Sequence, residues 1–133
     1  DALRMAILSL RNHTKNRIVT VFGCGGERDN QKRALMGKIA EELSDVVIVT
    51  DDNPRNENPK LIREMILSGC RNAIEIADRK EAIETAIDML VDGDSLLVAG
   101  KGHETYQQVG DKFINFNDKE VILNRISNDK CVF

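Results

Sequence analysis

The chain has 133 residues and a mass of 14.9 kDa, which is the size of one domain rather than two. Hydrophobic residues make up 41% and charged residues 31% of the sequence, which excludes a disordered tail, a fibrous repeat and a membrane protein. The formal net charge is −3 and only 4% of residues are aromatic, so we expect neither a basic nucleic-acid surface nor stacking platforms for bases.

The cysteines lie far apart and form no CxxC pair; they are Cys24, Cys70 and Cys131. This usage favours a reducing, cytoplasmic compartment. Cys24 precedes a predicted helix, but no base or second cysteine pairs with it, so we expect a structural thiol. The chain opens at Asp1 without methionine, and we therefore expect it to be a piece of a longer protein.

The first half of the chain alternates between helical and strand patterns. Apolar residues at helical spacing from Leu3 to Leu10 predict an opening helix, to which His13 is also assigned. Ile18–Phe22 predicts a buried strand that ends in glycines, and Val46–Thr50 predicts a second strand. The helix between these strands has a predicted apolar face made of Leu35, Ile39, Ala40 and Leu43.

The same alternation continues toward the C-terminus. Asn58 as N-cap and Pro59 at the first position predict the start of a third helix. Its predicted apolar face consists of Leu61, Ile62, Met65 and Ile66. Ala73–Ala77 predicts a third strand, and Asp78 with Glu81 predicts the capped start of a fourth helix.

The last part of the chain has a different pattern. Ser95–Ala99 predicts a fourth strand. Tyr106–Val109 and Lys112–Phe116, on either side of Gly-Asp, predict a β-hairpin. Asn117 with Glu120 then predicts the start of a final helix.

Strands separated by helices of ten or more residues predict an α/β fold, with a Rossmann-like, mostly parallel sheet, helices on both faces and a C-terminal β-hairpin. In such sheets, ligands bind beyond the carboxyl ends of the strands. The loops at those ends are Gly23–Arg28, Asp51–Arg55, Asp78-Arg79 and Gly100–Glu104. Glycines and unusual charged residues gather in these loops, which makes them the candidate site.

The first loop, Gly23–Arg28, is rich in glycine and leads into a helix. The GxGxxG dinucleotide motif fails because Arg28 replaces its third glycine, and no Walker A motif is complete in the chain. Two interpretations remain open. The loop is either a simple strand-to-helix turn or an anion site in which Arg28, Lys32 and Arg33 form a possible phosphate neighbourhood at a helix N-terminus.

The second loop, Asp51–Arg55, combines acids, an amide and a cation. An acid after the second strand is typical of ribose binding. Alternatively, Arg55 is suited to clamp a carboxylate while Asp52 and Asn53 hold amines or carboxylates. A solvated turn is the third interpretation, because Asp, Asn and Pro are common turn residues.

The third loop, Gly100–Glu104, places two glycines beside an acid. The glycines allow close approach of a ligand, and Glu104 is suited to pair with an ammonium group. His103 and His13 are the only histidines and form no ligand cluster, so we expect no metal site and a structural role for His103.

Four blocks of sequence together resemble the C-terminal domain of Mur ligases. They are Phe22–Asp29, Lys32–Gly37, Asp51–Arg55 and Ala99–Gln107. The resemblance implies that residues 1–133 form a single domain, the C-terminal amino-acid-binding domain of a three-domain ligase. The N-terminal UDP-sugar domain and the central ATPase domain of such a ligase would lie outside this chain.

The resemblance also implies an activity. Mur ligases use ATP and Mg²⁺ to phosphorylate a peptide carboxylate, and an amine then attacks the acyl phosphate. The Asp52–Arg55 block resembles that of members adding meso-diaminopimelate to UDP-N-acetylmuramoyl-L-alanyl-D-glutamate in peptidoglycan synthesis. We expect the central domain to bind most of the ATP and Mg²⁺, and the chain alone to be inactive, monomeric and without catalytic residues of its own.

Carried over by position, the contacts to meso-diaminopimelate would be Arg28, Asp52, Asn53, Arg55, Gly100 and Glu104. Arg55 would bind the distal carboxylate, with Asn53 beside it. Glu104 and the Gly100 carbonyl would take the distal ammonium. Two alternatives stay open: a related ligase using L-lysine or another amino acid, and a non-catalytic nucleotide-binding module. Arg55 speaks against lysine, and the failed glycine motif speaks against the module.

Overall fold

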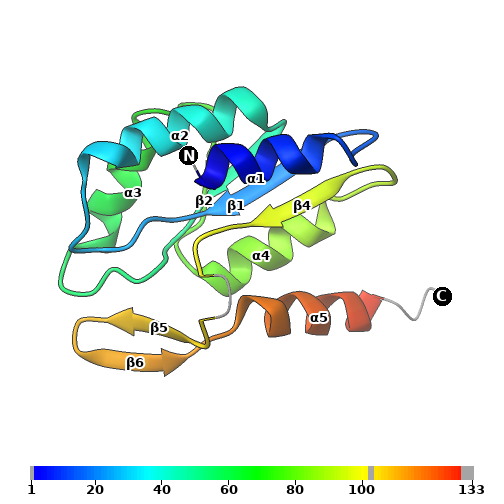
Figure 1. Ribbon diagram of the computed structural model, residues 1–133. Coiled ribbons are helices and arrows are strands. Elements are labelled where there is room, and N and C mark those ends of the chain that lie inside the picture. Colours follow the sequence, from blue (N-terminus) through cyan, green and yellow to red (C-terminus); the bar gives the residue numbers. More distant parts are fainter. Residues whose placement is uncertain (1, 102–103, 130–133) are drawn as a thin grey trace.

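A four-stranded parallel sheet forms the centre of the protein, whose computed structural model describes residues 2–101 and 104–129. The strand order is β3-β2-β1-β4 (Figure 1). The strands are β1 (Ile18–Phe22), β2 (Val46–Val49), β3 (Ile74–Glu75) and β4 (Ser95–Val98). Because the chain turns to opposite sides of β1 to reach β2 and β4, the carboxyl ends of β1 and β4 form the switch point at which such folds bind ligands.

Helices cover both faces of the sheet, as the sequence predicted (Figure 1). One face carries α1 (Ala2–Arg11), α2 (Gln31–Leu43) and α3 (Pro59–Leu67), and the other carries α4 (Arg79–Asp88). The final helix, α5 (Asp118–Asp129), packs against α4. None of the helices in residues 2–101 and 104–129 is both long and apolar enough to cross a membrane.

A separate antiparallel hairpin lies beyond the sheet, as predicted (Figure 1). It consists of β5 (Tyr106–Val109) and β6 (Lys112–Asn115). The rings of Tyr106 and Phe113 meet edge to face, with 5.3 Å between their centroids. A parallel bridge between Arg55 and Val109 joins the hairpin to the loop after β2.

The predicted helix starts are confirmed at the level of single hydrogen bonds. Lys60 N donates to Asn58 Oδ1 at 2.9 Å, and Glu81 N donates to Asp78 Oδ2 at 3.2 Å. At the last helix, Glu120 N donates to the side chain of Asn117 at 3.2 Å. Each contact satisfies a backbone N–H that the first helical turn leaves without a partner.

Several local expectations were wrong, including the apolar face of α3, where Leu61 and Met65 are exposed. The third strand is only two residues long, with Ile74 and Glu75 paired to Ile48 and Val49 of β2. His13 lies after α1 rather than within it. Leu35, expected on a buried face, is 54% exposed because α2 instead turns Gly37 toward α3, where a Cβ would overlap the Ile66 carbonyl oxygen. Close helix contact through Gly37, rather than the leucine stripe, therefore sets which face of α2 is buried.

Candidate functional site

The loops after β1 and β2 pack against each other backbone to backbone. A Cβ on Gly23 would overlap the carbonyl oxygen of Thr50, and one on Gly26 would overlap that of Pro54. Gly26 N also donates to the carbonyl oxygen of Asn53 at 2.7 Å. Glycine is therefore required here because no side chain fits between the two loops.

A buried ion pair between Arg33 and Glu57 fastens the same two loops. The guanidinium of Arg33 is 1% exposed and binds both carboxylate oxygens of Glu57, at 3.0 and 2.9 Å. It also donates to the carbonyl oxygen of Gly25 at 3.0 Å. Bonds from Arg33 and from Glu27 N lower the pKa of Glu57 to about 2. The side chain of Arg33, predicted near a phosphate, is occupied by these internal contacts.

Lys101 lies at the centre of a polar cluster formed with Asp52, Asn53 and Glu104. The sequence did not predict this role. Its side chain is fully buried, and its Nζ lies 2.6 Å from Asn53 Oδ1 and 3.1 Å from the Tyr106 carbonyl oxygen. Nζ also lies 3.0 Å from Asp52 Oδ1, at an angle that makes no aligned hydrogen bond, and 4.0 Å from Glu104 Oε1. One ammonium therefore faces the two acids that the sequence predicted as ligand contacts.

The side-chain amide of Asn53 connects Lys101 to Glu104. Its Oδ1 accepts from Lys101 Nζ and from Gln108 N, the latter at 2.9 Å. Its Nδ2 donates to Glu104 Oε1 at 3.3 Å. In addition, Gln107 Nε2 donates to the Asp52 carbonyl oxygen at 2.8 Å. The hairpin thus supplies two of the contacts that hold the loop after β2.

Arg55 adopts a left-handed backbone conformation, with φ of +53°, that is uncommon for a residue with a side chain. Hairpin contacts hold it there: Arg55 N donates to Gln108 O at 3.1 Å, and Gly110 N donates to Arg55 O. The Arg55 side chain reaches back to the first loop, where Nη1 donates to Gly26 O at 2.9 Å. Its Nε and Nη2 have no hydrogen-bond partner in the described part of the chain, so they are available to an anion.

The remaining predicted residues fall into two groups. Gly100 has φ of +116°, and a Cβ there would lie 3.1 Å from Asp52 Oδ2, so it joins the cluster of Asp52, Asn53 and Glu104. Lys32 is exposed in the first turn of α2, whereas Arg28 is exposed in the loop before α2, where a Cβ on Gly25 would lie 3.5 Å from Arg28 Cγ and 2.9 Å from Arg55 Nη1. His103 and Gly102 are outside the described residues.

A second buried arginine, Arg79, braces the carboxyl end of the sheet. It donates to the carbonyl oxygens of Asp51 and Ala99, which follow β2 and β4, at 3.2 and 3.1 Å. Its guanidinium also pairs with Asp118 at the start of α5, with two contacts of 2.7 Å. The Asp78-Arg79 loop, expected at the ligand edge, therefore contributes a buried structural arginine.

Cys24 is buried, and burial raises the pKa of its thiol to about 11. Its Sγ lies 3.7 Å from the sulfur of Met36. A thiol that stays protonated at neutral pH is a poor nucleophile, in line with the structural role expected for it.

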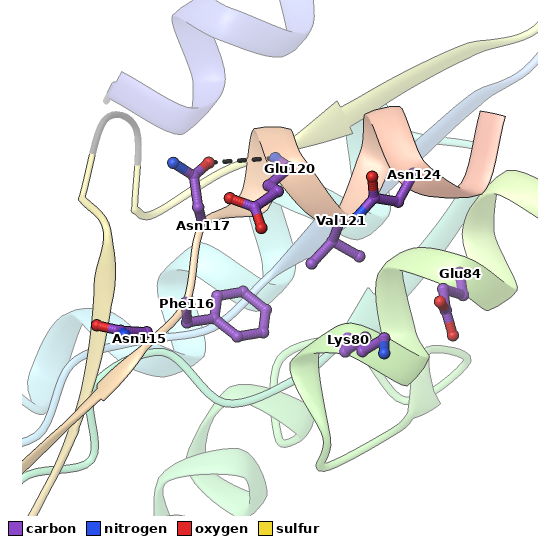
Figure 2. A pocket seen from close by; sticks show the side chains of 8 residues that line it. All are labelled: Lys80, Glu84, Asn115, Phe116, Asn117, Glu120, Val121 and Asn124. Carbon is purple, nitrogen blue, oxygen red and sulfur yellow. Dashed lines mark hydrogen bonds between the residues drawn. The ribbon is translucent and has the colours of Figure 1, made fainter. Parts of the chain in front are cut away.

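A pocket of about 480 Å³ lies elsewhere, between α4, α5 and the end of β6 (Figure 2). Lys80 and Glu84 line it from α4, while Phe116 and Val121 line it from the other side. The side chain of Asn117 caps α5 there (Figure 2). This pocket contains none of the residues that the sequence singled out for ligand binding, and no group of three His, Cys, Asp or Glu suited to a metal occurs among the described residues.

The chain was compared with known proteins. Residues 1–102 match the family model of the Mur ligase, glutamate ligase domain. Two similar curated proteins are both named UDP-N-acetylmuramoyl-L-alanyl-D-glutamate--2,6-diaminopimelate ligase. The one from Mesorhizobium japonicum is 53% identical over 92% of this chain and 25% of its own length. The one from Rickettsia bellii is 56% identical over 91% of this chain and 26% of its own length.

A solved structure of a UDP-N-acetylmuramoyl-L-alanyl-D-glutamate--2,6-diaminopimelate ligase has the same fold, with a TM-score of 0.90 and 38% identity. It covers 98% of this chain, which in turn covers 28% of that structure. The chain spans about a quarter of the length of the curated relatives that it matches. With its fold and the match over residues 1–102, the chain belongs to the Mur ligase family.

Proposed function

We propose that the chain is the C-terminal, amino-acid-binding domain of an ATP-dependent ligase that adds meso-diaminopimelate to UDP-N-acetylmuramoyl-L-alanyl-D-glutamate. The names of the similar ligases support this substrate, and their greater length supports further domains outside the chain. The amide bond would form when the amine of diaminopimelate attacks an activated peptide carboxyl. The protein would then act in peptidoglycan synthesis in the cytoplasm.

The observation that carries the proposal is that groups suited to bind a carboxylate and a group suited to bind an ammonium lie in one cluster. Arg55 offers free guanidinium N–H groups, and Asn53 offers an amide donor 3.3 Å from the carboxylate of Glu104. Together these groups match the distal end of diaminopimelate, which carries a carboxylate and an ammonium on one carbon. Lysine has only the ammonium and would leave the donors of Arg55 without their partner.

Gly100 completes the proposed site. Its φ of +116° and its closeness to Asp52 allow a ligand ammonium to approach the main chain beside Glu104. Arg28 would approach from the loop before α2, where its Cγ and Arg55 Nη1 both lie near Gly25. We propose that the rest of the ligase binds most of the ATP and Mg²⁺.

The test uses the full-length ligase supplied with ATP, Mg²⁺ and UDP-N-acetylmuramoyl-L-alanyl-D-glutamate. Phosphate release is measured with meso-diaminopimelate and, separately, with L-lysine. We expect release with diaminopimelate alone. Release with lysine would keep the ligase activity but reject the proposed substrate, and release with neither would reject the ligase.

A variant pair tests the site itself. Arg55→Ala should raise the KM for diaminopimelate at least tenfold, because a charge-assisted contact of this kind contributes about 1.5–3 kcal/mol. Arg71→Ala is the matched control. Arg71 is exposed and precedes β3, so it lies at the amino ends of the strands, whereas the site lies at their carboxyl ends. An unchanged KM in Arg55→Ala would contradict the site assignment.

A further inference from the structure

We propose that Lys101 is a positioning residue, which fixes the Asn53 amide so that only its N–H donors face the amino-acid site. The proposal deepens the proposed function and rests on it. Lys101 itself is too buried to touch a ligand: its side chain has no exposed surface. Any effect of Lys101 on binding must therefore pass through its neighbours.

The contacts of Asn53 determine the orientation of its amide. Lys101 Nζ lies 2.6 Å and Gln108 N lies 2.9 Å from the same amide atom. An ammonium and a backbone N–H can only donate, so the atom that they share must be the oxygen. The nitrogen then points to Glu104, which as a carboxylate can only accept. All three contacts agree on one orientation.

Lys101 contributes the shortest of these three contacts, and its ammonium also offsets the charge of Asp52 at 3.0 Å. Without it, Oδ1 would keep only the Gln108 N–H, and the long contact of Nδ2 with Glu104 would be the one other hydrogen bond of this amide in the described part of the chain, so the amide would turn more readily. A turned amide would place its oxygen against the carboxylate of Glu104 and against the carboxylate of an incoming ligand. It would also remove the donor that stands beside Arg55.

Lys101 is itself anchored, which makes it a suitable reference point. The Tyr106 carbonyl oxygen accepts from Nζ at 3.1 Å, so the ammonium bridges the loop after β4, the loop after β2 and the hairpin. A side chain held by three segments loses little further entropy when it orients Asn53. The role assigned to Lys101 is therefore preorganisation of a binding residue rather than contact with the substrate.

The first experiment measures steady-state kinetics of the full-length ligase carrying Lys101→Met, which keeps an unbranched side chain one atom shorter than lysine but cannot donate. We expect the KM for meso-diaminopimelate to rise at least tenfold, while kcat changes less than threefold and the KM for ATP does not change. Arg17→Met is the control for lost stability, because Arg17 pairs with Asp94 at the amino end of β1, away from the site. Its KM for diaminopimelate should stay at the parent value.

A double-mutant cycle separates positioning from general destabilisation. In an Asn53→Ala background, Lys101→Met should raise the KM for diaminopimelate less than threefold further, because the amide that it orients is gone. An equal, tenfold rise in both backgrounds would overturn the proposal. So would a fall in kcat with no change in KM.

Lys101→Gln keeps the proposal testable if Lys101→Met does not fold. Glutamine is neutral and one atom shorter than lysine, but with a small shift its amide can donate to Asn53 Oδ1, so its KM should stay within threefold of the parent value. A tenfold rise in folded Lys101→Gln would overturn the positioning role. Failure of the proposed function is distinguishable, because the unmodified ligase would then release no phosphate with diaminopimelate.

Discussion

Arg33 and Glu57 form an ion pair in which one partner is buried and the other is partly in water. The side chain of Arg33 is 1% exposed, whereas that of Glu57 is 34% exposed. The pair joins the start of α2 to the loop that follows Asn53 and Arg55, and Glu57 also accepts from Glu27 N. The geometry of the candidate site therefore depends on a contact that lies outside it.

The unequal burial of this pair predicts unequal costs for its two deletions. Glu57→Gln leaves a buried, charged guanidinium without a counter-ion and should destabilise the chain by about 3 kcal/mol. Arg33→Met leaves a carboxylate that water can still solvate, and should cost about 1 kcal/mol. Urea unfolding of the two variants followed by circular dichroism checks the order, and equal costs would contradict it.

The lowered pKa of Glu57 predicts a loss of stability in acid. Its pKa is about 2 in the folded chain against an ordinary value of 4.5, so the unfolded state binds the proton more readily. The stabilising contribution is therefore complete above about pH 4.5 and is lost as the pH falls toward 2. Thermal midpoints between pH 7 and pH 2, measured for the chain and for Glu57→Gln, should converge at the acid end. A constant difference over that range would exclude Glu57 as a source of the acid sensitivity.

Alanine substitutions at two glycines of the first loop should have different effects, one on stability and the other on substrate binding. Gly26→Ala would force a Cβ into the carbonyl oxygen of Pro54 and should cost about 2–3 kcal/mol, because backbone must move. Gly25→Ala would place a Cβ 2.9 Å from Arg55 Nη1, the far end of a long side chain rather than backbone, so its stability should change by less than about 1 kcal/mol. Its KM for diaminopimelate in the full-length ligase should rise instead, because the guanidinium of Arg55 is displaced. Thermal midpoints and KM values that change in parallel for both variants would contradict this distinction.

The buried cysteines predict slow thiol chemistry in the native state. Burial raises the pKa of Cys24 and of Cys70 to about 11, so little thiolate exists at pH 8. Iodoacetamide labelling followed by peptide mass spectrometry should modify these two positions slowly in native protein and rapidly in urea. Rapid native labelling of Cys24 would show that the first loop opens.

Much of the fold could be predicted from local sequence because its signals are local. Alternation of apolar runs and helical patterns predicted a parallel sheet with helices on both faces, and Asn58 and Asp78 marked helix starts that single hydrogen bonds confirm. The third strand was predicted too long because the extent of a strand depends on its pairing, and the ladder with β2 covers only Ile74 and Glu75. The buried face of α2 was misjudged at Leu35, since its contact with α3 depends on a helix distant in the sequence.

The sequence by itself determined which loops meet, because the carboxyl ends of parallel strands share one edge, and the tertiary structure brings Asp52, Asn53, Gly100 and Glu104 together there. Their binding role remains a prediction. Only the tertiary structure decided which charged groups are open to a ligand and which are buried in ion pairs and hydrogen bonds within the protein. In the sequence, Arg33 and Lys101 are both cations in or next to the candidate loops, but both are buried against partners contributed by other loops. Burial and pairing depend on long-range contacts, and no local pattern encodes them.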